Sequence, residues 1–331
     1  MKEVIETREL ITVTFRGMVL RGTYHRPYGL STGSGLDLNE PSAIGVLLVN
    51  AGFLPRSGLG DSAVYWADSF AACGYPSFRI DLQGLGDSDG EPPADLSDFV
   101  NSGGFAPELA AIVKDIVRRF GLSGVAVVAH CASTVSAIFA AALIRECKGL
   151  ALLDPYFHLS QGGSKLRAGL SDWAWRSRLG GSISTVYHWL KHVHLFLRWR
   201  KPPSNANLPL LRRWKQLGSS GLPILVMKAP ALKARGSQPR LGEFDYLNYV
   251  QARSGRASRI VVKYIEGTNH SFADRLGRIA VRQHTERWLR SCFPLMERQA
   301  SALNPPRSEH SGFKNHTENH EMRSHHSNTA R

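Results

Sequence analysis

The segment 124-GVAVVAHCASTVSAIFAAA-142 decides how this chain folds. Six apolar residues of β type, 124–129, lead into His130, Cys131 and Ala132, and an Ala-rich helical pattern follows. This order predicts a strand that turns sharply into a helix and lifts the Cys131 side chain above the edge of a sheet, the layout of a nucleophile elbow. The usual pattern is G-x-S-x-G. Here Ala129 and Ser133 take the two glycine positions, which need small side chains because the backbone packs closely there.

A cysteine in the elbow predicts acyl transfer through a thioester, because a thiolate attacks a carbonyl carbon as an activated serine does. The alternative is a structural cysteine, since free cysteines are among the most buried residues. The chain has four cysteines, and they lie far apart in no metal-ligand spacing, at Cys73, Cys131, Cys147 and Cys292. We therefore expect no metal, no bound cofactor and no disulfide framework.

Alternating strand and helix patterns predict the fold class. The expected strands are two antiparallel strands within 8–26, then 44–49, 76–80, 124–129, 149–153, 223–227 and 259–265. Helical patterns cover 62–73, 106–120 and 273–291, besides the helix after Cys131. Together they predict an α/β protein with a mostly parallel twisted sheet and helices on both faces.

We divide the chain into a core formed by 1–154 and 223–299, a basic Trp-rich helical lid at 155–222, and a disordered His-rich tail at 300–331. The composition, with 43% apolar and 21% charged residues, is typical of a globular protein. No apolar run approaches the roughly 20 residues of a membrane span. The first residues lack a signal-peptide core, so we expect a cytoplasmic location.

A histidine in the expected place supports the nucleophile. In enzymes with such an elbow the order along the chain is nucleophile, acid, histidine, each after a strand. His270, in 267-GTNHSF-272, follows the last expected strand and precedes the last helix. We predict that it takes the proton of Cys131 and passes it to the leaving group.

Two carboxylates are candidates for the acid that orients His270. Asp245, in 242-GEFD-245, lies in the expected interval, although about fourteen residues separate this stretch from the strand at 223–227. Asp154 comes directly after the strand at 149–153 and is the second candidate. We expect Asp245 to hold the imidazole and stabilise its cation. A cysteine enzyme depends less on this acid, because a thiol is already partly ionised near neutral pH.

An oxyanion hole needs two backbone N–H groups aimed at the developing charge. Ala132, directly after the nucleophile, is predicted to supply one of them. Gly52, in the turn after the strand at 44–49, is predicted to supply the other, with Phe53 as the alternative. The turn by itself also explains a glycine at this position.

These motifs together resemble the α/β-hydrolase family over residues 8–292. Within it, the chain resembles the exosortase A system-associated hydrolases, named for their genomic setting beside exopolysaccharide and protein-sorting genes. The segments that carry this resemblance are 50-NAG-52, 55-PRSG-58, 79-RIDLQGLGDSDGEP-92, the cysteine elbow and 164-SKLRAGLSDWAWRSRLGG-181. That subgroup usually has G-x-C-x-G at the elbow and an acid close after its strand, so Ala129, Ser133 and the long loop before Asp245 are departures. The resemblance implies an α/β-hydrolase fold with a lid, and we assign no chemistry to the glycine-rich loop 79–92.

The segment 155–222 contains eleven Lys or Arg residues, a single acid, Asp172, and five of the seven tryptophans. It falls where an α/β-hydrolase places its lid. An apolar helical stripe runs along it, formed by Ile183, Val186, Tyr187, Leu190, Val193 and Leu197. The simplest interpretation is a lid helix with a solvated cationic face. The functional alternatives are docking of an acidic carrier protein, an anionic substrate or peripheral contact with a membrane. No nucleic-acid motif accompanies the charge, so we expect no nucleic acid.

The sequence thus predicts an acyl-transfer enzyme, a hydrolase of a thioester or ester that works through Cys131, His270 and Asp245 and an acyl-enzyme. The second hypothesis is an acyl- or aminoacyltransferase that moves groups between carrier-protein thiols. It rests on a likeness of chemistry to cysteine-elbow transferases. The third is a non-catalytic interaction protein that keeps the fold.

Overall fold

A computed structural model describes residues 7–27, 43–49, 52–159, 202, 204–229, 246–254 and 257–295. Most of the predicted lid, the stretch that contains Asp245 and the predicted tail lie outside the described residues.

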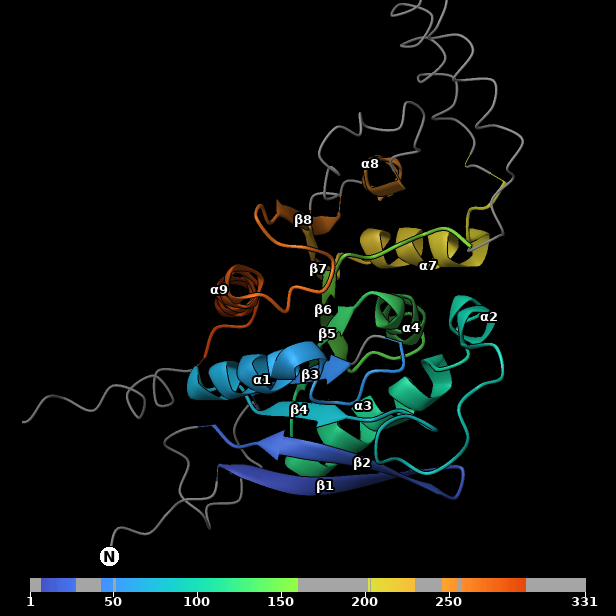
Figure 1. The fold of residues 1–331 in the computed structure, drawn as a ribbon. Coiled ribbons are helices and arrows are strands. Elements are labelled where there is room, and N and C mark those ends of the chain that lie inside the picture. The colour runs from blue at the N-terminus through green and yellow to red at the C-terminus, as the bar shows by residue number, and fades with distance from the viewer. Residues whose placement is uncertain are drawn as a thin grey trace, which may run out of the picture.

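The core is one eight-stranded sheet with the strand order β1-β2-β4-β3-β5-β6-β7-β8 (Figure 1). β2 pairs antiparallel with both β1 and β4, and all the other neighbouring strands pair in parallel. The strands are β1 (Arg8–Phe15), β2 (Met18–His25), β3 (Ile44–Val49), β4 (Ser77–Ile80), β5 (Gly124–His130), β6 (Cys147–Leu153), β7 (Pro223–Lys228) and β8 (Arg259–Tyr264). The predicted mostly parallel sheet is confirmed.

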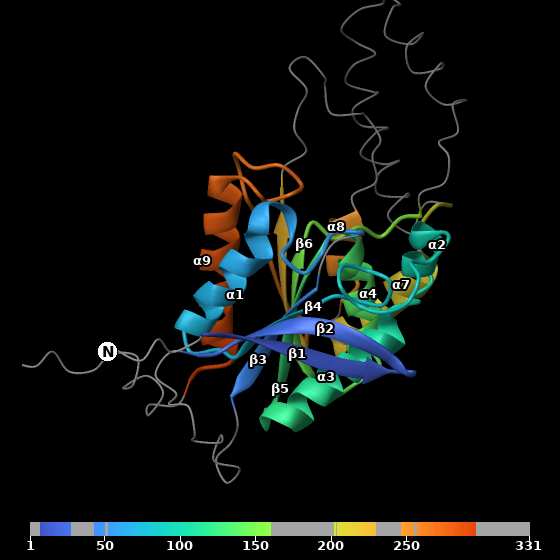
Figure 2. The same ribbon diagram turned by 60° about the horizontal axis from the view of Figure 1, so that its bottom comes forward.

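Helices cover both faces of the sheet (Figure 2). α1 and α9 lie on one face, and α3, α4 and α7 lie on the other. The described helices are α1 (Ser62–Ala72), α2 (Leu96–Asn101), α3 (Ala106–Phe120), α4 (Ala132–Ala141), α7 (Leu208–Ser219), α8 (Tyr246–Gln251) and α9 (Arg275–Cys292), with a 3-10 turn at Leu59–Asp61. None of the helices in these ranges is long and apolar enough to cross a bilayer.

The burial of the central strands on both faces explains why their sequences are continuous apolar runs. Alternate residues of β3 enter different cores, with Val46 and Leu48 on the side of α1 and α9, and Leu47 and Val49 on the side of α3 and α4. All four are at most 4% exposed. Strands that are buried on both faces lose the polar alternation of a half-exposed strand.

Helix α7 belongs to the helix layer on the α4 face, although its residues fall in the segment predicted as the lid. Leu210, Trp214 and Leu217 are buried, and the helix packs against α4. The Trp214 ring meets Phe157 edge-on with 5.2 Å between centroids, and its Nε1 donates a hydrogen bond to Ser254 Oγ at 3.1 Å. α2, α7 and α8 were not predicted from the sequence as separate helices.

The packing of α7 predicts a large effect of Trp214→Ala. Trp214 is 1% exposed, so truncation leaves a cavity and removes the partner of Ser254 Oγ. We expect the free energy of unfolding to fall by about 3–5 kcal/mol, measured by urea denaturation. Leu208→Ala is the matched control, because Leu208 lies on the same helix and is 46% exposed. Equal, small losses in both variants would contradict the assignment of α7 to the core.

Candidate active site

Cys131 lies at a sharp reversal between β5 and α4. Its backbone has φ 53° and ψ −118°, a conformation that residues other than glycine rarely adopt. Such a conformation costs about 1–3 kcal/mol and persists only where the surroundings hold it. Here Cys131 N donates to Leu153 O at 3.0 Å, and Thr134 Oγ1 donates to Cys131 O at 2.6 Å. The reversal leaves the thiol partly exposed at the end of the strand.

Ser133 contributes more than small size to the elbow. Its side-chain oxygen accepts a hydrogen bond from His130 N at 2.9 Å and can donate to Val49 O at 3.0 Å or to His130 O at 2.9 Å. The residue is only 4% exposed. The hydroxyl therefore ties the end of β3 to the reversal after β5, a contact that a glycine could not make.

His270 meets a carboxylate at the end of β6. Its Nδ1 donates to Asp154 Oδ2 at 2.5 Å, with 54% of the His270 side chain exposed and 12% of the Asp154 side chain exposed. Hydrogen bonds to Asp154 and then to Cys131 raise the pKa of His270 from 6.5 to about 10. The imidazole is thus protonated at neutral pH, between a carboxylate on one side and the thiol on the other.

Asp154 is held on two sides. Its Oδ1 forms an ion pair with Lys228 Nζ, and its Oδ2 accepts the bond from His270. Its backbone has φ 50°, and its N–H donates to Met227 O at 2.7 Å, which fixes the carboxylate above the ends of β6 and β7. Burial alone would raise the pKa of Asp154, but the hydrogen bonds to His270 and Lys228 outweigh it and hold the pKa below its usual value.

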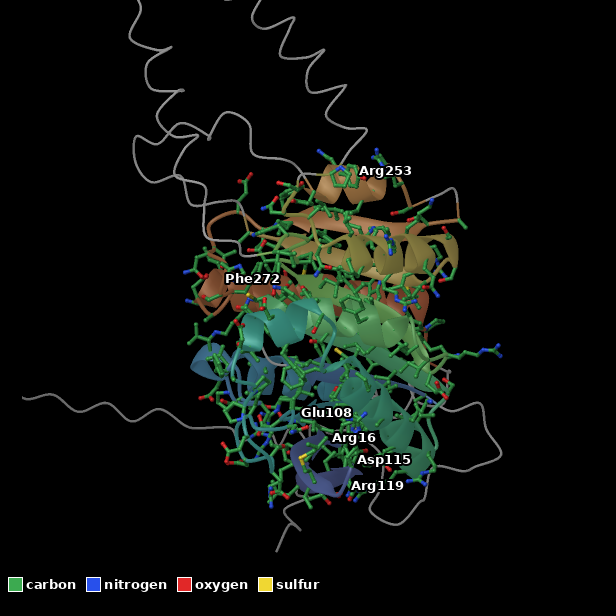
Figure 3. The ribbon with its side chains drawn as sticks, turned by 90° about the vertical axis from the view of Figure 1, so that its right-hand side faces the viewer. Arg16, Glu108, Asp115, Arg119, Arg253 and Phe272 are labelled. Carbon is green, nitrogen blue, oxygen red and sulfur yellow. The ribbon has the colours of Figure 1, made fainter. Side chains whose placement is uncertain are left out.

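His130 supports the loop that carries His270. Its Nε2 lies 2.7 Å from His270 O, and since a carbonyl can only accept, Nε2 carries the proton. Burial lowers the pKa of His130, so the ring is neutral and has one fixed tautomer. Phe272, labelled in Figure 3, is buried and has φ 50°. Its ring meets that of His130 edge-on with 5.8 Å between centroids.

Gly52 begins a loop that is anchored to the sheet. Gly52 has φ 52°, which explains the glycine. Further along the loop, Arg56 N donates to Asp81 Oδ1 and Arg56 Nη1 to Asp81 Oδ2, both at 2.5 Å, and Asp81 is 1% exposed. A Cβ on Gly86 would lie 2.4 Å from the Asp81 carboxylate, which explains a glycine in the motif at 79–92. Ala132 is the first residue of α4, so its N–H has no acceptor within the helix.

The structure brings four of the five predicted site residues to one edge of the sheet. Gly52 follows β3, Cys131 and Ala132 follow β5, and His270 follows β8, so all stand at the carboxyl ends of parallel strands. Asp245, the first candidate for the acid, lies outside the described residues. Asp154, the second candidate, is the carboxylate in contact with His270.

Sequence reasoning missed three contributors to this site: the Ser133 hydroxyl, His130 and Lys228. His130 directly precedes Cys131, and Lys228 ends β7. The sequence did hold a signal for His130 and Lys228, because both residues lie at the carboxyl end of a parallel strand, where α/β sheets bind ligands.

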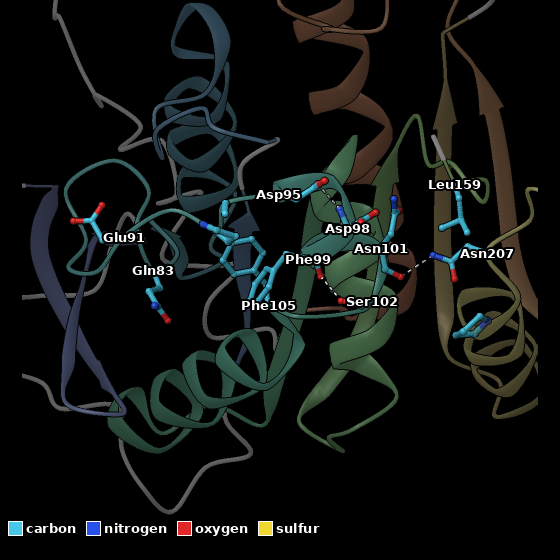
Figure 4. Close-up of a pocket in the computed structure, with 13 residues that line it drawn as sticks. Gln83, Glu91, Asp95, Asp98, Phe99, Asn101, Ser102, Phe105, Leu159 and Asn207 are labelled. Atoms are coloured by element: carbon cyan, nitrogen blue, oxygen red, sulfur yellow. Dashed lines mark hydrogen bonds between the residues drawn. The ribbon is translucent and has the colours of Figure 1, made fainter. Parts of the chain in front are cut away.

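A cavity of about 800 Å³ lies next to α2, between this helix and the segments that contain Leu159 and Asn207 (Figure 4). Neither Cys131 nor His270 is among the residues that line it. Three carboxylates and two phenylalanine rings are part of the lining. The lining residues are Gln83, Glu91, Pro93, Ala94, Asp95, Asp98, Phe99, Asn101, Ser102, Phe105, Leu159, Asn207 and Pro209. Among the residues that the structure describes, no group of three or more His, Cys, Asp or Glu side chains could hold a metal ion.

Solved structures share the fold. An esterase from Pyrococcus furiosus, PF2001, is 12% identical, covers 86% of this chain and 90% of its own, and superposes with a TM-score of 0.54. DcsB, solved in complex with its substrate analogue, is 16% identical, covers 86% of this chain and 99% of its own, with a TM-score of 0.51. The chain matches no protein-family model and no curated protein. At these identities the likeness concerns the fold, and the fold of this chain is the α/β-hydrolase fold.

The contact between Asp154 and His270 predicts that Asp154→Asn lowers the pKa of His270 from about 10 toward its usual 6.5. Histidine NMR titration measures this directly. Because the folded-state pKa is raised, the contact stabilises the fold fully below about pH 6.5, and this stabilisation is lost as pH rises through about 10. The difference in melting temperature between wild type and the variant should therefore shrink over that range. Glu266→Gln, at an exposed carboxylate on the same loop, is the control, and an equal shift there would contradict a specific contact.

Loss of the Ser133 hydroxyl leaves His130 N–H without its acceptor in a buried site. We expect Ser133→Ala to lower the free energy of unfolding by about 1–3 kcal/mol. Ser102→Ala is the control, since the Ser102 hydroxyl makes an exposed bond to Phe99 O. A denaturation curve of S133A that coincides with that of S102A would show that the hydroxyl does not hold the elbow.

Proposed function

We propose that this protein hydrolyses acyl thioesters or esters through a covalent intermediate on Cys131, with His270 as acid and base and Asp154 as its carboxylate partner. One observation carries the proposal: His270 is bonded to Asp154 through Nδ1 at the same edge of the sheet as the Cys131 elbow. The strained elbow, the fold and the resemblance to cysteine-elbow hydrolases support it.

In the first half-reaction, the Cys131 thiolate attacks the carbonyl carbon of the substrate. A C–S bond forms and the carbonyl π electrons move to oxygen, where the N–H groups of Gly52 and Ala132 stabilise the oxyanion. When the tetrahedral intermediate collapses, the bond to the leaving group breaks, and that group takes the proton of the imidazolium. Nδ1 stays bonded to Asp154, so Nε2 delivers this proton.

In the second half-reaction, the neutral imidazole of His270 takes a proton from water as the water oxygen attacks the thioester carbon. Collapse of that intermediate releases the carboxylic acid and returns the Cys131 thiolate beside the imidazolium. The His270 side chain is 54% exposed, so water can reach it. This exposure favours hydrolysis over transfer to a second thiol.

Asp154 takes the role that the sequence assigned first to Asp245. The reason is geometric, because Asp154 Oδ2 lies 2.5 Å from His270 Nδ1. A carboxylate that accepts the Nδ1 proton keeps the ring in the tautomer that directs Nε2 at the nucleophile. A protein with a purely binding role would have no need of such an arrangement, so the non-catalytic hypothesis has less support.

We propose that the acyl group of the substrate enters the cavity next to α2, whose lining favours an apolar, uncharged or cationic chain. Phe99 and Phe105 offer apolar surface, while Glu91, Asp95 and Asp98 would repel an anionic chain. Docking of an acidic carrier protein would involve the basic segment 155–222, most of which lies outside the described residues. Transfer between carrier thiols therefore stays the second hypothesis.

The proposal predicts a covalent adduct on Cys131. After incubation with a panel of acyl thioesters, the intact mass of the wild-type protein should rise by the mass of one acyl group or the substrate should turn over. Cys131→Ala should show no adduct and a loss of turnover of about 10³-fold or more. Cys131→Ser should be much weaker than wild type, because an alcohol must then be deprotonated.

Cys73→Ala serves as the control for thiol removal, since Cys73 is a partly buried free cysteine bonded to Arg290 and not part of the site. It should acylate like wild type. Turnover that survives in C131A would overturn the assignment of the nucleophile.

A further inference from the structure

The carboxylate of Asp154 lies between two cations. Oδ2 accepts the bond from the imidazole of His270 at 2.5 Å, and Oδ1 pairs with the ammonium of Lys228, the last residue of β7. The side chains of Asp154 and Lys228 are 12% and 29% exposed, so solvent screens this pair less than a surface pair. A carboxylate that orients His270 needs only the imidazole as its partner. The second cation, Lys228, therefore requires an explanation.

The charges that face His270 come from neighbouring strand ends. Cys131 stands on the elbow, His130 ends β5 and is neutral, Asp154 follows β6, and Lys228 ends β7. Among these groups, Lys228 carries the positive charge that stays constant during the reaction. By sharing the charge of Asp154, its ammonium weakens the attraction between this carboxylate and the imidazolium.

We propose that Lys228 is a positioning residue of this site, which balances the charge of Asp154 so that His270 can act as acid in one half-reaction and as base in the next. The effect of Lys228 on His270 is inferred from the Lys228–Asp154–His270 contacts. Its importance for the two half-reactions rests on the proposed function.

The two half-reactions place opposite demands on His270. Acylation of Cys131 needs an imidazolium that can protonate the leaving group, whereas hydrolysis of the acyl-enzyme needs a neutral imidazole that can accept a proton from water. A carboxylate paired with His270 alone would favour the imidazolium that acylation needs and disfavour the neutral imidazole that hydrolysis needs. The ammonium of Lys228 at Oδ1 of Asp154 makes it easier for His270 to become neutral for the second half-reaction. The carboxylate that orients the ring stays in place.

The first test measures the proton affinity of His270 without any turnover. In the Cys131→Ala background the thiolate no longer contributes, so histidine NMR titration reports the effect of Asp154 and Lys228 alone. We expect Lys228→Met to raise the pKa of His270 by about one unit and Lys228→Arg to leave it near the parent value. An unchanged pKa in the K228M variant would overturn the proposal.

The second test follows hydrolysis of the preformed acyl-enzyme against pH, by intact mass with Cys131 present. Lys228→Met should move the midpoint of this rate profile to higher pH, with about a tenfold slower rate at a pH below both midpoints, and Lys228→Arg should restore it. If Lys228 served only the fold, Lys228→Met would lower the melting temperature or the rate without moving the midpoint of the profile. That result would also overturn the proposal.

Lys263→Met is the matched control for removal of one positive charge. Lys263 lies on the adjacent strand β8, in register with Met227, and is exposed. Equal shifts in K263M and K228M would mean that the general field of the protein, and not the ion pair with Asp154, sets the proton affinity of His270. If wild type forms no acyl-enzyme while K228M still shifts the NMR titration, then the proposed function fails and the role of Lys228 stands.

Discussion

The backbone reversal at Cys131 is the constraint on which the site depends. β5 pairs with β3 on one side and with β6 on the other, and all three strands run in parallel, so their carboxyl ends meet at one edge of the sheet. A regular helix entry would carry Cys131 past this edge, whereas φ 53° turns its side chain up from the end of β5. The Ser133 hydroxyl and the N–H of Cys131 join the reversal to β3 and β6, so the strain is held by the same strands that deliver the other site residues.

Charge alternates along the site. The imidazole of His270, the carboxylate of Asp154 and the ammonium of Lys228 come from the ends of three strands, and the carboxylate contacts both cations. This alternation lets a mostly buried carboxylate remain ionised, because an unpaired carboxylate in such a place would bind a proton. Beneath the loop of Gly52, Asp81 forms a second ion pair with Arg56 and also accepts the hydrogen bond of the Arg56 N–H.

The limits of sequence prediction follow from what local patterns can express. The strands of the sheet gave strong signals because their apolar runs are bounded by turns and alternate with long helices. α2 and α8, with six residues each, are too short for helical periodicity to be recognised. α7 mixes Leu210, Trp214 and Leu217 with Arg212, Arg213 and Lys215, a pattern that a solvent-facing lid helix would share, and so its burial against α4 was not predicted.

The sequence by itself determined the sheet, the elbow with Cys131 at its turn and the position of His270, because each depends on residue types within one short segment and on the order of segments along the chain. Only the tertiary structure decided which side chains touch. The contacts of His270 with Asp154 and His130, and that of Ser133 with Val49, join residues 116, 140 and 84 positions apart. Such contacts depend on how the ends of different strands are aligned and on the rotamer of each side chain. No local pattern encodes that alignment, and for this reason Asp154 was the second candidate for the acid and Lys228 was not among the candidates at all.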